Sequence, residues 1–262
     1  MSSFHFLSAA HSLQALALVA AIAASPLVAA ARPASAMRRA APRATVRTVV
    51  EHLSAHAPAY TATLDVPQLV WPGQTVVRNK VNVAIVMWLE GQVRQFASAV
   101  RSDLASAKGL PATLPESSLH VSFQVTRLDG KVLSLRLAAA SYVRGQASPS
   151  NVAAGLTFNL ATGAPYTLAS LFRPHAAYLR ALGRASVAGL RAFRPAGARC
   201  YVGGSGPGAK AAASVAWWLS GNSLVLAYPP GLYTAAYCGL ATITIAAQRL
   251  APLLAVGGPL SP

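Results

Sequence analysis

The sequence has few acidic residues. Six aspartates and glutamates stand against 22 lysines and arginines in 262 residues, which gives a net charge of +16 and a pI near 11.1. The six are Glu51, Asp65, Glu90, Asp103, Glu116 and Asp129. No carboxylate side chain follows residue 129, so chemistry that needs a pair of carboxylates, such as glycoside hydrolysis by an acid and a base, has no residues in the second half.

Charged residues of either sign are also scarce, at 11% against a usual share of about 25%. Hydrophobic residues make up 54% of the chain. This composition excludes intrinsic disorder, which needs low hydrophobicity and many charges. The length leaves room for one large domain or two small ones with a real core.

Only two cysteines are present, Cys200 and Cys238, and each stands beside a tyrosine. Their separation matches no metal-ligand spacing, and an even pair favours a disulfide in an oxidising compartment. The bond would close a loop of about 39 residues, for which loop-closure entropy gives roughly 4 kcal/mol. The alternative is two unrelated buried thiols.

An apolar run over residues 13–31 precedes Ala34-Ser35-Ala36, a small-x-small site of the kind that signal peptidase cuts. We therefore expect residues 1–36 to be a signal peptide, with a second cleavage site after Ala30, and the protein to be secreted or held in the cell envelope. The first twelve residues lack lysine and arginine. There are two alternatives. The apolar run is an uncleaved anchor, which would be the only link to a membrane, or the true start of the chain is Met37.

Hydrophobic periodicity predicts an α+β fold, with antiparallel sheets packed against two long amphipathic helices and a short C-terminal helix. A basic linker is expected over residues 37–56. The expected strands cover residues 60–66, 119–127, 131–142, 154–160, 215–219, 223–228 and 241–245. The expected helices cover residues 79–107, 174–193 and 247–254, with Pro174 in the first turn of the second.

One stretch, residues 158–190, reads FNLATGAPYTLASLFRPHAAYLRALGRASVAGL. Its TG, TLxxLF and YLxxL elements resemble the RsiV-like family, domain of unknown function 3298. Residues 217–254 are similar to the final strands and closing helix of that family, and residues 60–100 to the companion region that usually precedes it. The resemblance implies a companion region over 57–142 and an RsiV-like domain over 143–256.

The best-known RsiV-like proteins are membrane anti-sigma factors whose exterior domain binds lysozyme, and other relatives accompany polysaccharide deacetylases. Only twelve residues precede the apolar run here, so we expect a secreted member without the anti-sigma segment. Arg144-Gly145-Gln146-Ala147 also replaces the Gly-Gly-Ala-His motif common in the family. The resemblance leaves two alternatives open: an accessory domain of cell-wall polysaccharide hydrolysis or deacetylation, and a lysozyme-binding protein.

Three features resemble metal-binding, phosphate-binding or catalytic motifs, but each lacks residues that the motif requires. His52 and His56 have the i, i+4 spacing of zinc ligands on a helix, without a third ligand nearby; a solvated linker helix explains them better. The glycine-rich loop over residues 203–210 lacks the Gly-Lys-Ser/Thr order of a phosphate-binding loop. His175, in the first turn of the second expected helix, has no acid to orient it. We expect no catalytic residues, metal or cofactor, and therefore not an enzyme.

A helical wheel of residues 174–193 separates two faces. Leu179, Leu182, Leu190 and Phe193 share one arc; Arg180, Arg184, Arg191 and, if the helix continues, Arg194 share the adjoining arc. These four arginines are called the arginine stripe below. The stripe either keeps an acid-poor protein in solution or binds an anionic surface of the envelope. No nucleic acid is expected as partner, because no aromatic side chains interleave the arginines. The expected function is a non-enzymatic binding domain for an unknown extracellular protein or anionic envelope polymer or glycan.

Overall fold

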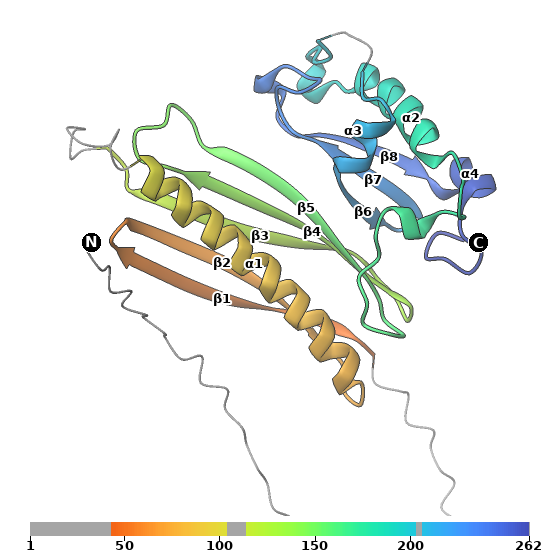
Figure 1. The fold of residues 1–262 in the computed structure, drawn as a ribbon, viewed down its shortest axis with the longest axis horizontal. Coiled ribbons are helices and arrows are strands. Elements are labelled where there is room, and N and C mark those ends of the chain that lie inside the picture. Colours follow the sequence, from red (N-terminus) through yellow and green to blue (C-terminus); the bar gives the residue numbers. More distant parts are fainter. Residues whose placement is uncertain (1–42, 104–113, 203–205, 262) are drawn as a thin grey trace, which may run out of the picture. The chain divides into compact units, whose positions relative to one another are not determined.

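The computed structural model describes residues 43–103, 114–202 and 206–261, so the expected signal peptide over 1–36 and residues 37–42 of the expected linker lie outside it. The fold is α+β, as predicted, with one mixed and one antiparallel sheet among the described residues (Figure 1). No helix in these ranges is long and apolar enough to cross a membrane.

A five-stranded sheet and one long helix make up the first part of the described chain. The strands, in the same order in space and in sequence, are β1 (Thr45–His56), β2 (Ala59–Val70), β3 (Ser117–Leu128), β4 (Val132–Tyr142) and β5 (Ser150–Asn159). Helix α1 (Thr75–Asp103) lies across one face of this sheet and buries Val81, Ile85 and Leu89 against it. Their four-residue spacing is part of the pattern that predicted the helix.

Strands β2 and β3 run parallel, which corrects the expectation of purely antiparallel sheets. Helix α1 connects them, and its 29 residues span about 43 Å at 1.5 Å per residue. That is close to the length of a 12-residue strand such as β2, roughly 40 Å. The helix therefore returns the chain to the end of the sheet where β2 began, and β3 must run in the same direction.

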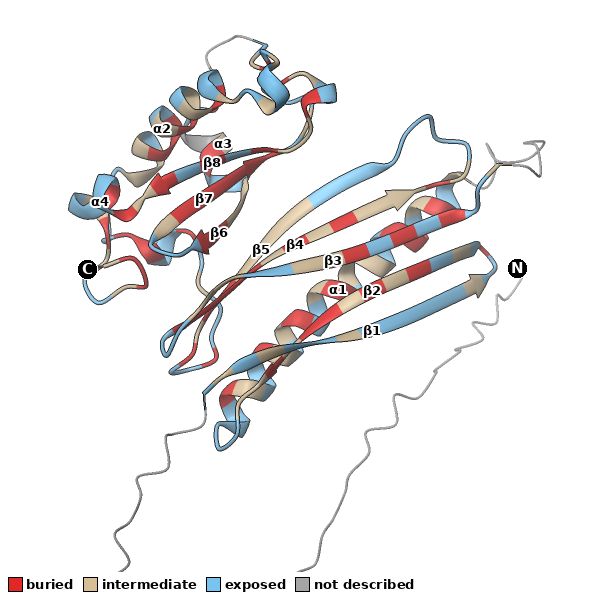
Figure 2. Cartoon of the chain, turned by 180° about the vertical axis from the view of Figure 1, so that it is seen from behind, coloured by how far each residue is buried: buried red, intermediate tan, exposed pale blue. Residues whose placement is uncertain are grey.

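Residues 45–56 pair along their whole length with β2, so the prediction of a linker is wrong for this part of 37–56. Strand β1 lies at the edge of the sheet, and most of its side chains are exposed (Figure 2). Val46 and Val49 pack partly against the core. An edge strand with so little buried surface has no sustained apolar alternation, and the sequence pattern therefore missed it.

A three-stranded antiparallel sheet forms the second part of the described chain. Its strands are β6 (Ala216–Ser220), β7 (Ser223–Tyr228) and β8 (Ala241–Ala246). Helix α2 (Tyr178–Ala192) packs on this sheet through Leu182 and Leu190, which are fully buried in one cluster with Ile243. Short helices complete this part: η1 (Ala169–Leu171), η2 (Pro195–Gly197), α3 (Ala209–Ser214), η3 (Ala236–Cys238), α4 (Ala247–Leu250) and η4 (Ala251–Leu253).

Helix α2 begins at Tyr178, so the placement of Pro174 in its first turn is wrong. The preceding residues are held by the C-terminal segment: Phe172 forms a bridge with Leu254, and the Arg173 N–H donates to the carbonyl of Leu253 at 2.9 Å. His175 then adopts a positive φ of 60°, which a helix does not accommodate. These contacts keep the residues before Tyr178 out of the helix.

The two sheets meet where β6 lies against β5, on the face opposite α1. The Ser134 hydroxyl accepts the Leu219 N–H at 2.9 Å and pairs with the Thr157 hydroxyl at 2.8 Å, all three groups being buried. The predicted division between residues 57–142 and 143–256 falls between β4 and β5, which are paired in one sheet.

Candidate functional site

The arginines of the predicted stripe lie on the exposed side of α2. Arg180, Arg184 and Arg191 are exposed, whereas Leu182 and Leu190 of the same helix are buried against the sheet. Arg194 follows the helix; its guanidinium is exposed and donates to the carbonyl of Phe193 at 2.9 Å. The structure therefore brings three of the four predicted residues onto one helical face and places the fourth just beyond its end.

No acid lies on α2 to neutralise the stripe. Within the described residues the ion pairs are Glu90–Arg94 on α1 and Arg127–Asp129 at the turn between β3 and β4. Neither pair involves α2. The field of the stripe therefore extends into solvent until salt screens it, at about 8–10 Å.

The disulfide between Cys200 and Cys238 is formed, as predicted. It joins the segment after α2 to η3, where the Tyr237 hydroxyl donates to the carbonyl of Arg199 at 3.4 Å. The Arg191 guanidinium lies 5.8 Å from the centre of the Tyr201 ring, a cation–π distance. The cross-link thus fixes the surface next to the C-terminal end of the stripe.

Within the described part of the chain, His52, His56 and His175 do not come together in a site. His52 and His56 lie on strand β1 and not on a helix, which corrects the expectation of a linker helix. Four residues along a strand span about 13 Å, too far for two ligands of one metal ion. His52 Nδ1 lies 3.3 Å from the Thr63 hydroxyl, and His175 lies in the turn before α2. Residues 203–205 of the glycine-rich loop lie outside the described residues.

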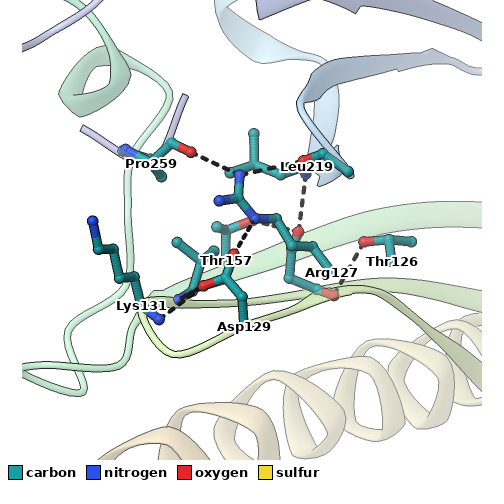
Figure 3. Close-up of polar contacts among 10 residues, drawn as sticks. Thr126, Arg127, Asp129, Lys131, Thr157, Leu219 and Pro259 are labelled. Carbon is teal, nitrogen blue, oxygen red and sulfur yellow. Dashed lines mark hydrogen bonds and ion pairs between the residues drawn. The ribbon is translucent and has the colours of Figure 1, made fainter. Parts of the chain in front are cut away.

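Sequence reasoning missed a second cationic group, centred on Arg127 at the end of β3 (Figure 3). Its Nη1 donates to two carbonyls from the second part of the chain, Gly221 at 3.2 Å and Pro259 at 2.7 Å. Its Nε donates to Asp129 at 2.7 Å. The two carbonyls lie far from Arg127 in sequence, so no local motif marks the group.

Asp129 organises the turn between β3 and β4. Its Oδ1 accepts the backbone N–H groups of Lys131 and Val132, each at 2.8 Å. Partial burial acts to raise the pKa of this carboxyl, but the hydrogen bonds from Lys131, Arg127 and Val132 outweigh burial and hold the pKa below its usual value. Asp129 is therefore ionised at neutral pH and forms hydrogen bonds with three neighbours, while its side chain stays partly exposed.

The α+β fold just described is shared by solved structures of the domain of unknown function 3298 family. A member from Bacteroides fragilis superimposes with a TM-score of 0.59 at 16% identity, covering 82% of this chain and 94% of that one. A member from Pseudomonas aeruginosa gives a TM-score of 0.53 at 12% identity, covering 84% and 97%. No family model and no curated protein matches the sequence. At these identities the likeness concerns the fold alone.

Proposed function

We propose that this chain is an exported, non-enzymatic binding domain, held on an anionic polymer of the cell envelope by the arginine stripe of α2. We further assign residues 57–142 and 143–256 to the companion and RsiV-like regions, on the strength of the sequence resemblance. The observation that carries the binding proposal is the exposed row of Arg180, Arg184 and Arg191 on a helix without acids.

A polymer fits this surface better than a lipid bilayer does. A helix that lies in a membrane interface presents large apolar side chains to the lipid. The leucines of α2 that are buried, Leu182 and Leu190, instead face the protein core, and the exposed positions beside the arginines include Ala177 and Ala188. Helix α2 itself thus offers charge without an exposed large apolar side chain to insert.

The test compares two triple variants of equal charge. Arg180→Gln/Arg184→Gln/Arg191→Gln removes the stripe, and Arg47→Gln/Arg94→Gln/Arg101→Gln removes three exposed arginines from the other part of the chain. Retention on immobilised dextran sulfate is measured at low and high salt. Stripe removal should weaken binding on the order of tenfold at low salt, since an exposed ion pair contributes about 0.2–1 kcal/mol. The loss should shrink at high salt.

Equal weakening by the two variants would show that net charge alone is responsible, and would overturn the proposal. Vesicles containing phosphatidylglycerol are the second arm of the experiment. If the parent is retained more tightly on these vesicles than on the polymer, the partner of the stripe is a lipid surface and not a polymer.

Export is supported by the disulfide, because such bonds persist in oxidising compartments. The intact mass of the secreted protein should lack the residues before Ala31 or Met37 and show the loss of two hydrogens to the Cys200–Cys238 bond. A mature chain that retains Met1 and two free thiols would contradict export.

The non-enzymatic part of the proposal has its own measurement. The purified protein is incubated with peptidoglycan and with acetylated sugars, and products are followed by mass spectrometry. No turnover is the expected result. Release of sugar fragments or acetate would favour the hydrolysis and deacetylation alternative.

A further inference from the structure

A second cationic surface lines an open pocket of about 750 Å³. Three segments form its walls: the β3–β4 turn with Arg127 and Lys131, residues 159–173 with Tyr166 and Arg173, and the C-terminal residues 251–261. Small-molecule sites usually measure about 300–1,000 Å³, so the pocket has room for a sugar-sized ligand.

The charge of the pocket has one sign. Arg127, Lys131 and Arg173 line it, and no acidic residue does so among the described residues. Asp129 is the nearest carboxylate in sequence, but its oxygens are turned to Arg127 and to the backbone N–H groups of the turn. An anionic ligand would therefore meet Lys131 and Arg173, which form no ion pair within the described residues, together with Arg127, whose charge is already paired with Asp129.

Two of the cations are fixed in place before any ligand arrives. Arg127 is held by the carbonyls of Gly221 and Pro259, and the Arg173 Nε donates to the carbonyl of Leu254 at 3.0 Å. The planar guanidinium matches the geometry of carboxylate and phosphate oxygens. Because these side chains are already ordered, binding loses less conformational entropy.

The remaining wall suits a hydroxylated ligand. Tyr166, Asn159 and Ser261 are polar residues of the lining, and the buried apolar residues Val132 and Leu254 also line the pocket. A ligand with one anionic group and several hydroxyls would use both kinds of surface.

We infer that this pocket binds an acidic sugar, with the carboxylate or phosphate group placed among Arg127, Lys131 and Arg173. This site is separate from the stripe on α2. Its test does not depend on whether the proposed function is correct. Arg127 also ties the two sheets together, so the test uses the other two cations.

The experiment measures binding of glucuronate, glucose 6-phosphate and neutral glucose by nuclear magnetic resonance titration. The parent should bind at least one of the two anions in the millimolar range, and the tighter of the two identifies the preferred group. Lys131→Gln and Arg173→Gln should each weaken that binding about tenfold, since a hydrogen bond to a charged group is lost. The control, Arg101→Gln, removes one exposed charge from α1 and should leave it unchanged.

Three results would overturn the inference. One is that neither anion binds at about 10 mM, where a site of millimolar Kd is nearly saturated. Another is that glucose binds as tightly as the anions. The third is that the two pocket variants, with spectra that show intact folding, bind as the parent does.

Discussion

Residues 43–160 and residues 161–261 both pack a helix on a sheet, but they differ in size, charge and covalent support. The first region has five strands, a 29-residue helix and every acidic residue of the chain. The second has three strands, a 15-residue helix and the disulfide. A small core gives less stabilisation per residue, and cross-links commonly compensate for it. The second region also carries uncompensated cations, which makes it the candidate binding surface.

Removal of the disulfide should have the largest effect and should fall on the second region. Cys200→Ala/Cys238→Ala opens a loop with a sequence separation of 38, and loop-closure entropy gives about 4 kcal/mol for that size. Urea unfolding measures the total loss, and hydrogen exchange locates it. We expect β6–β8 to lose protection and β3 and β4 to retain it. Equal loss in both sheets would remove the distinction between the regions.

A side chain at Gly155 should disturb the contact between the regions. A Cβ there would collide with the backbone carbonyl of Trp217, whereas a Cβ at Gly130 would meet no atom within 4 Å. Gly155→Ala should therefore destabilise the protein by about 1–3 kcal/mol, and Gly130→Ala should stay within about 0.5 kcal/mol. Thermal unfolding followed by circular dichroism measures both. The same stability in both variants would mean that the sheets can separate freely at this point.

The sequence predicted those elements whose apolar residues follow the regular spacing of a helix or a strand. The spacing of Val81, Ile85 and Leu89 predicted α1, and the apolar pattern of residues 119–127 and 131–142 predicted β3 and β4. Strand β1 was missed because an edge strand buries little. The parallel pairing of β2 and β3 was missed because it follows from the length of α1 and not from a local pattern.

The arginine stripe could be predicted because it depends only on the period of one helix. The pocket could not, because its cations come from separate segments. Arg127 and Arg173 meet at the pocket only when the C-terminal residues, through Leu254 and Pro259, fold against both. The start of α2 escaped prediction for the same reason, since contacts with residues 253 and 254 hold the preceding residues outside the helix.

Loss of a buried hydroxyl should weaken the second region by a moderate amount. The Tyr228 hydroxyl donates to Ser186 at 2.7 Å, and both residues are fully buried. Tyr228→Phe leaves the Ser186 hydroxyl without this partner and should cost about 1–2 kcal/mol. Adding Ser186→Ala should recover part of the loss in urea unfolding. Additive losses would show that the two hydroxyls act independently.

The same tyrosine should make the second region less stable toward unfolding at alkaline pH. Burial raises the pKa of Tyr228, so the folded protein keeps a proton that the unfolded chain releases above about pH 10. Its contribution to stability is therefore present below that pH and is lost as pH rises through the raised pKa. Stability in urea should fall less steeply above about pH 10 in Tyr228→Phe than in the parent. If stability falls equally steeply with pH in both proteins, groups other than Tyr228 cause the loss of stability at alkaline pH.

The smallest expected effect is on the stability of the first region at acid pH. The lowered pKa of Asp129 means that its contribution to stability is present above the ordinary value of 3.8 and is lost as pH falls through the lowered pKa. Asp129→Asn should cost no more than about 1 kcal/mol near neutral pH, because the carboxylate is partly exposed and screened by solvent. Urea unfolding at neutral and acid pH measures this cost.

The pH dependence separates the charge of Asp129 from its place in the turn. The urea midpoints of parent and variant should converge as the pH falls through the lowered pKa of Asp129, because the parent carboxyl then becomes protonated as well. Glu51→Gln removes an exposed carboxylate from the edge strand of the same sheet and serves as the charge-matched control. If Asp129→Asn lowers the midpoint equally at both pH values, the aspartate acts through the shape of the turn, and its charge contributes nothing to the difference between the regions.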